Sequence, residues 1–171
     1  MHLLVGHLPI RRCFVKKTIL SAFMTANILC PIYAFSDGIH DHKSHNSETS
    51  GQMGDPKNVT KEIIVEANDN MRFTPSSINV KKGETIKITL LNKGKVNHEL
   101  VLGSKKELKI HAEMMLKNPT MKHQEGESSI TAEPGQSKSL IWKFTKSGTV
   151  DFGCLLPGHY PAGMVGEFKV K

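Results

Sequence analysis

The chain has 171 residues, of which 23 are Lys or Arg, 16 are Asp or Glu, nine are His and three are Cys. This length suits one domain with appendages, and three cysteines exclude a disulfide-rich scaffold. The formal net charge is +7, but four of the basic residues lie among the first 36. Without them, the chain has 19 basic and 16 acidic residues and a net charge of +3. This small excess does not favour nucleic acid, and we expect no nucleic-acid partner.

Residues 1–36 have the pattern of a secretory signal peptide. Basic residues within 11–17 precede an apolar run over 18–32, and small residues follow the run. Asn27 and Pro31 interrupt the run, which disfavours the alternative of a retained membrane anchor. We therefore expect a periplasmic or otherwise exported protein with no membrane span after cleavage of the leader.

Removal of this leader changes the set of cysteines. Cys13 and Cys30 lie within it, so the exported protein keeps Cys154 alone. One thiol per chain leaves no partner for an intramolecular disulfide. We expect this exported form to be a monomer.

Residues 37–60 are predicted to form a disordered tail. The segment is polar and has almost no aliphatic side chains, so burial cannot offset the entropy of ordering it. It carries His40, His42 and His45 at close spacing. A solvated linker is the favoured interpretation, and a loose metal-collecting arm is the alternative.

From residue 61 onward, short strand-like segments alternate with turn residues. Ile86, Ile88 and Leu90 alternate with polar residues within 85–91, which is the period of a half-buried strand. The other predicted strands span 62–67, 77–80, 98–102, 137–144, 149–153 and 163–170. So many short strands favour an antiparallel β-sandwich.

One segment departs from the strand pattern and predicts a short helix over 104–117. Ser104 is a suitable N-cap, and Glu107, three residues later, completes the pattern of a capping box. Asn118 and Pro119 follow and end the helix. The helix is therefore an insertion in an otherwise all-β chain.

The residues with the most distinctive chemistry lie near the carboxyl end. Cys154, His159 and Met164 share one predicted loop at Cys-x4-His-x4-Met spacing. Soft sulfur ligands select copper, and two imidazoles, one thiolate and a weak axial methionine form the electron-transfer copper site. His98, where a turn enters a strand, is the best candidate for the second histidine.

Each of these residues has a plainer interpretation when taken alone. A lone cysteine or methionine usually packs in a core. A catalytic pair of Cys154 and His159 is the enzymatic alternative, but it leaves Met164 unexplained. Zinc prefers more thiolate or imidazole ligands and no thioether. The combination favours copper.

The loop Cys154…Pro157-Gly158-His159…Gly163-Met164, with the upstream pair Asn97-His98, resembles the ligand loop of the cupredoxins, the superfamily of plastocyanin, azurin and auracyanin. The resemblance covers residues 61–171 and implies a Greek-key β-sandwich that binds type 1 copper. It implies that Cys154, His98 and His159 are equatorial ligands and that Met164 is the axial ligand.

The wider pattern is similar to a subgroup of exported cupredoxins associated with copper tolerance. The segments that carry this similarity are 71–75 (MRFTP), 97–103 (NHELVLG) and 111–115 (HAEMM). The resemblance implies a role in copper homeostasis.

The helical insertion predicts a second, weaker copper site. Its candidate ligands are His111, Met114, Met115, Met121 and His123. The first three lie at positions i, i+3 and i+4 of the helix, and thioethers with imidazoles suit monovalent copper. The alternative is ordinary packing of an amphipathic helix, shared with Leu108 and Leu116.

Two functions follow from these features. The first is copper binding for homeostasis or tolerance, with cycling between Cu(II) and Cu(I). The second is a dedicated soluble electron carrier between exported redox partner proteins. An enzyme is poorly supported, because a multicopper oxidase needs a His-Cys-His motif and a dinuclear centre needs two cysteines in the loop, and the sequence has neither.

Overall fold

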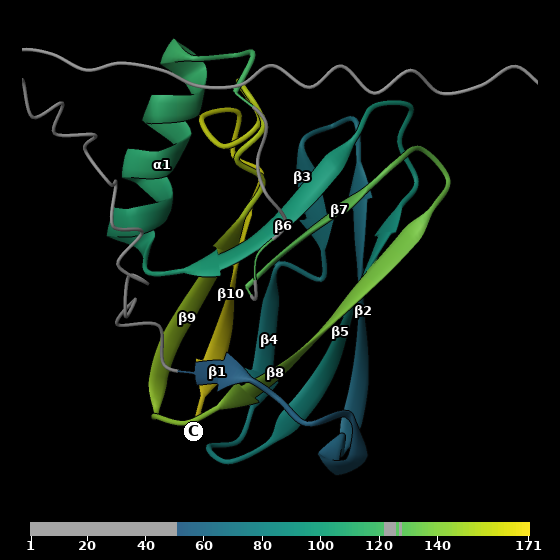
Figure 1. Cartoon of the computed structure of the whole chain (residues 1–171), viewed down its shortest axis with the longest axis vertical. Coiled ribbons are helices and arrows are strands. Elements are labelled where there is room, and N and C mark those ends of the chain that lie inside the picture. Colours follow the sequence, from purple (N-terminus) through teal and green to yellow (C-terminus); the bar gives the residue numbers. More distant parts are fainter. Residues whose placement is uncertain (1–50, 122–125, 127) are drawn as a thin grey trace, which may run out of the picture. The chain divides into compact units, whose positions relative to one another are not determined.

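The computed structural model describes residues 51–121, 126 and 128–171, which fold into two five-stranded sheets, one α-helix and one short 3-10 helix (Figure 1). The predicted leader, the tail histidines and His123 lie outside the described residues. Within them, no helix is both long and apolar enough to cross a membrane.

The two sheets differ in strand order. The first contains, in spatial order, β1 (Gly51–Met53), β8 (Ser137–Phe144), β5 (Thr85–Asn92), β2 (Lys61–Asn68) and β3 (Arg72–Thr74). The second contains β4 (Ser77–Val80), β10 (Val165–Val170), β9 (Gly148–Gly153), β6 (His98–Gly103) and β7 (Ser129–Ala132). This arrangement confirms the predicted all-β sandwich.

Most strand pairs in the described residues are antiparallel, as expected, but two are parallel. β2 pairs with β5 in parallel, and β4 pairs with β10 in parallel. The physical reason is that the chain leaves the first sheet after β3, forms β4 in the second sheet and returns with β5. Strands that the chain reaches by crossing between sheets do not need to reverse direction.

The core lies between the sheets. Ile86, Ile88 and Leu90 of β5 are fully buried, which confirms the alternation in the sequence. Across the core, the ring centroids of Phe73 in the first sheet and Phe152 in the second lie 5.3 Å apart. These aromatic and aliphatic side chains make a rigid base for the strand ends.

The structure corrects the predicted amino-terminal boundary of the folded part. β1 and the 3-10 helix η1 (Pro56–Asn58) lie within the segment predicted to be a disordered tail. β1 pairs with the edge of β8, and Gly51 packs against the indole of Trp142. Backbone pairing and the absence of a side chain at Gly51 therefore order a segment that has few aliphatic residues.

The predicted helix is confirmed as α1 (Lys105–Lys117). Glu107 N–H donates to Ser104 Oγ over 3.3 Å, and Ser104 N–H donates to Glu107 Oε2 over 3.0 Å, which is the reciprocal capping box. Leu108 and Ala112 are buried against Leu155. The helix therefore packs onto the end of the sandwich where residues 154–164 form a loop (Figure 1).

Candidate metal centre

Three side chains that can bind a metal converge at one end of the sandwich. One ligand atom each from His98, Cys154 and His159 can be chosen so that all three lie within 4.8 Å of one another. Cys154 Sγ lies 3.2 Å from His159 Nδ1, and the ring centroids of His98 and His159 are 5.3 Å apart. The structure thus brings together residues that are 61 positions apart in the sequence, from 98 to 159.

Pairing between β6 and β9 explains this convergence. The strands are antiparallel with Val101 opposite Gly153, so the start of β6 lies beside the chain that continues past β9. There, Glu99 N–H donates to Cys154 Sγ over 3.3 Å. The sheet register therefore holds the thiol next to the residue that follows His98.

The loop over 154–164 is organised by its own backbone. Cys154 N–H donates to Met164 O, and Met164 N–H donates to His159 O, each over 3.1 Å. Gly158 and Gly163 have φ angles of 87° and 94°, a region that favours glycine. These contacts bring both ends of the loop together around Cys154.

Met164 occupies the position that the sequence predicts for a fourth ligand. It is fully buried and belongs to the same core cluster as Cys154. Its backbone is hydrogen-bonded to both Cys154 and His159. Burial beside the thiol fits a core methionine as well as a weak ligand, so its coordination stays a prediction.

Arg72 connects the loop to β3. Its Nη1 donates to Ala162 O and to Met71 O, each over 2.7 Å. A Cβ atom built on Gly163 would lie 3.0 Å from the same nitrogen, so the guanidinium group lies directly over this glycine. The position of the loop is therefore coupled to a strand of the other sheet.

The site stabilises neutral side chains when no cation is present. Burial raises the pKa of the Cys154 thiol to about 12, and the amide of Glu99 offsets part of this effect. Burial, followed by the nearby His98, lowers the pKa of His159. A buried thiol and imidazole become good ligands when a cation replaces the proton.

One buried nitrogen atom of this site lacks a hydrogen-bond partner in the part of the chain that the structure describes. Nδ1 of the fully buried His98 has no hydrogen-bond partner among the described residues, whereas Nε2 of the same ring lies 3.2 Å from Asp69 Oδ1. A buried polar atom without a partner costs about 1–3 kcal/mol. The donor set of sulfur and imidazole nitrogen, with this orphaned nitrogen, fits a copper ion.

The candidate ligands of the second site are in different environments. Met115 is 1% exposed and packs in the interior, while Met114 is 42% and Met121 47% exposed. His111 is half-buried, and His123 lies outside the described residues. Burial of Met115 supports the packing alternative for that residue and leaves Met114 and Met121 as the exposed candidates, with His111 half-buried on the same helix as Met114.

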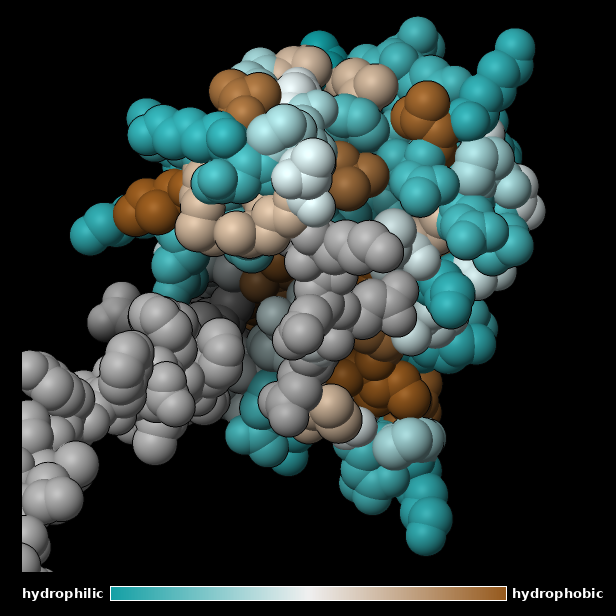
Figure 2. All heavy atoms as spheres, turned by 45° about the horizontal axis from the view of Figure 1, so that its top comes forward, coloured by the Kyte–Doolittle hydropathy of each residue, from teal (hydrophilic) through white to brown (hydrophobic). Residues whose placement is uncertain are grey.

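Several large apolar side chains of the described residues are exposed to solvent, some of them on α1. From the side shown in Figure 2, hydrophilic side chains predominate, and hydrophobic ones form separate patches. Exposed apolar side chains here include Ile110, Met114 and Leu116 of α1. The outer side of the helix is therefore mixed in character.

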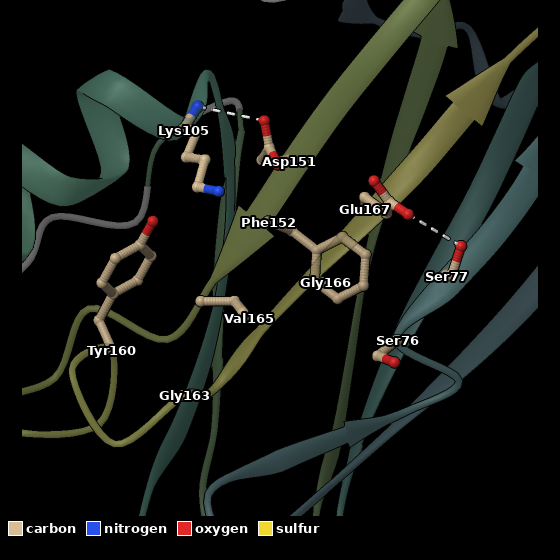
Figure 3. Close-up of a pocket in the computed structure, with 10 residues that line it drawn as sticks. All are labelled: Ser76, Ser77, Lys105, Asp151, Phe152, Tyr160, Gly163, Val165, Gly166 and Glu167. Atoms are coloured by element: carbon tan, nitrogen blue, oxygen red, sulfur yellow. Dashed lines mark hydrogen bonds between the residues drawn. The ribbon is translucent and has the colours of Figure 1, made fainter.

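A groove of about 440 Å³ lies beside the loop, between the start of α1 and strands β9 and β10 (Figure 3). Its walls include Tyr160 and Val165, and its charged groups are Lys105, Asp151 and Glu167. None of the three converging ligands lines it. The groove is thus separate from the candidate metal centre, and its charges do not favour one ligand class.

Sequence reasoning missed two residues that support the site, Asp69 and Arg72. Arg72 lies in the segment 71–75 that carries the similarity to copper-tolerance cupredoxins, but the sequence does not indicate its contact with the loop. An acidic residue in a polar turn is ordinary, so nothing local marks Asp69. Its role depends on contacts with residues 26 and 29 positions away.

The fold and the donor set together define a class of protein. The sequence pattern of the family described as copper binding proteins, plastocyanin/azurin family, matches residues 59–171. The chain therefore belongs to this family of copper-binding proteins, which confirms the resemblance and the cofactor predicted from the ligand loop.

Two copper-resistant cuproproteins are similar in sequence to nearly the whole chain. A copper-resistant cuproprotein CopI from Rubrivivax gelatinosus is 38% identical over 166 residues, which cover 92% of this chain and all of that protein. A second CopI, from Vibrio cholerae, is 29% identical and covers 91% of this chain and 99% of that protein.

Solved structures show the same fold. Reduced auracyanin from Roseiflexus castenholzii aligns with a TM-score of 0.56 and 21% identity, covering 66% of this chain and 98% of that chain. At this level of identity the likeness concerns the fold alone.

Proposed function

We propose that this chain is an exported copper protein that serves copper tolerance, binding one copper ion through His98, Cys154 and His159 with Met164 as a weaker fourth ligand. The observation that carries the proposal is the convergence of the three ligand atoms within 4.8 Å in a member of a copper-binding family. The similarity to copper-resistant cuproproteins over nearly the full chain favours tolerance over a dedicated carrier.

The residues of this chain prepare the site before metal enters. The amide of Glu99 donates to Cys154 Sγ, which stabilises negative charge on the sulfur. The hydrogen bonds among Cys154, His159 and Met164 hold the loop in place, so the ligands need little rearrangement. When bound, copper supplies a one-electron couple between Cu(II) and Cu(I).

Export and a non-enzymatic role belong to the same proposal. The predicted leader over 1–36 supports export, and the free, buried Cys154 has its thiol available for a metal ion. His159 is half-buried, so its ring edge offers a route for electrons to a redox partner protein. No substrate-processing motif in the sequence supports an enzyme.

The first experiment tests the ligand set. We expect the chain without its leader to bind one tightly held copper with intense visible absorption from a copper–thiolate bond, and Cys154→Ser to lose this absorption. His40 in the tail provides a control, because His40→Ala should keep it. A wild-type protein that binds copper without this absorption contradicts the proposed site.

A second experiment separates tolerance from electron carriage. A copper-sensitive bacterial host that exports the wild-type chain should grow at higher copper concentrations than the same host exporting Cys154→Ser at equal abundance. Equal growth of the two strains, with the coloured copper site intact in the purified wild-type protein, would support the carrier instead.

The helix supports a second proposal, that His111 and Met114 with Met121 form a loose site for monovalent copper. Met114 is 42% and Met121 47% exposed, so both side chains are open to solvent. In a Cys154→Ser background, we expect Met114→Ala with Met121→Ala to weaken Cu(I) binding measured by competition with a chelator. Identical titrations would end this proposal.

A further inference from the structure

Asp69 joins two loops at the metal end of the domain. It lies in the turn between β2 and β3, and its side chain is 39% exposed. Its Oδ2 accepts a hydrogen bond from Lys95 N–H over 2.8 Å, and its Oδ1 lies 3.2 Å from Nε2 of the buried His98. One carboxylate thus contacts both the loop before β6 and the first candidate ligand.

The chemistry of this contact determines where the imidazole proton lies. An ionised carboxylate can only accept hydrogen bonds, so Nε2 of His98 must be the donor. In a neutral imidazole, a proton on Nε2 leaves a lone pair on Nδ1. Nδ1 is the buried atom for which the described part of the chain offers no hydrogen-bond partner. The contact with Asp69 therefore leaves Nδ1 as the nitrogen of His98 that is available to a metal ion.

The surrounding backbone provides space for this contact. A Cβ atom on Gly94 would overlap Asp69 Oδ1 and lie 2.9 Å from His98 Nε2. Gly94 N–H donates to Asn92 Oδ1 over 2.8 Å, and Asn92 Nδ2 donates to Val96 O over 2.7 Å. The loop is thus held in a shape in which a side chain at position 94 would displace the carboxylate of Asp69.

We propose that Asp69 is a positioning residue of the copper site, which holds His98 as the Nε2–H tautomer and favours Cu(II) over Cu(I) through its negative charge. This inference rests on the proposed copper site. Carboxylate partners of ligating imidazoles raise the basicity of the ligand and fix its orientation. A negative charge behind the ring stabilises the more highly charged ion, so the reduction potential is lower than it would be without Asp69.

The test compares Asp69→Ala and Asp69→Asn with the wild type. Loss of such a partner weakens metal binding by about 10–100-fold, and we expect this loss for Cu(II) with a smaller loss for Cu(I). If Cu(II) affinity falls tenfold more than Cu(I) affinity, the reduction potential rises by about 59 mV for this one-electron couple. Competition with chelators and protein-film voltammetry measure these quantities.

A second readout needs no metal. Nitrogen NMR of the metal-free protein, at a pH where His98 is neutral, should show the Nε2–H tautomer in the wild type and a mixture in Asp69→Ala. Asp55→Asn is the matched control, because Asp55 also accepts a hydrogen bond from a backbone amide, that of Lys57 over 2.9 Å, but does so at the N-cap of η1. It should change neither the tautomer nor the potential.

The outcomes distinguish this inference from the proposed function. If both Asp69 variants keep the coloured copper site, with the wild-type His98 tautomer, the same ratio of Cu(II) to Cu(I) affinity and the same reduction potential, the proposed role of Asp69 is wrong. The proposed copper site would then still stand. A merely structural role predicts lower stability with equal loss for both ions and no change in potential. Absence of the coloured site in the wild type overturns the proposed function, and the NMR measurement then still decides whether Asp69 sets the tautomer. Asp69→Asn is nearly isosteric and keeps the comparison valid if Asp69→Ala does not fold.

Discussion

Removal of the Arg72 guanidinium should loosen the loop that carries the candidate ligands. Arg72 donates to Ala162 O across 90 positions of sequence, while its bond to Met71 O is local. Only the first bond connects separate parts of the fold. In Arg72→Ala the carbonyl of Ala162, which is exposed, can be rehydrated, so the loss is smaller than for a buried group.

The size of the effect follows from these contacts. A hydrogen bond from a charged donor contributes about 1.5–3 kcal/mol, and solvent access to this exposed pair reduces the expected loss to about 1–1.5 kcal/mol. For a domain of about 100 residues, each kcal/mol lowers the midpoint of thermal unfolding by about 4–8 °C. We therefore expect Arg72→Ala to lower the midpoint of the metal-free protein by about 4–12 °C.

Thermal unfolding followed by circular dichroism measures this change. Arg72→Lys should recover part of the loss, because one ammonium group reaches one carbonyl but lacks the planar fork. In the copper-loaded protein, Arg72→Ala should also shift the visible absorption, since the loop carries His159 and Met164. A midpoint and spectrum equal to those of the wild type would refute the argument that Arg72 holds the loop.

Two further predictions concern the methionines. Met164→Gln should keep copper bound but change the absorption spectrum and reduction potential, because an amide oxygen replaces the weak thioether; an unchanged spectrum and potential would argue against axial ligation. Met115→Ala should lower the free energy of unfolding by about 2–5 kcal/mol because it leaves a cavity under the helix, whereas Met114→Ala should change it by less than about 0.5 kcal/mol. Denaturant unfolding measures both free energies. Equal losses in Met115→Ala and Met114→Ala would contradict the argument that only Met115 packs in the interior.

The sequence predicted the parts of the fold that depend on local pattern. Alternation over Ile86, Ile88 and Leu90 predicted a strand, and the capping box at Ser104 predicted where the helix begins. It did not predict β1, β3 and β7, which have three or four residues each. In such short segments, pairing with a neighbouring strand decides the structure and the period of apolar residues carries little information.

The sequence by itself determined the kind of chemistry this protein carries. Thiol, imidazole and thioether lie within one loop of eleven residues, 154–164, and their types alone point to copper. The tertiary structure decided which of these side chains lie within contact distance of one another. His98 reaches Cys154 because Val101 pairs with Gly153, and Asp69 reaches His98 because two distant loops pack together at Gly94. Ligand identity is a property of single residues, whereas proximity depends on strand register and loop packing, and these form only when the whole sandwich folds.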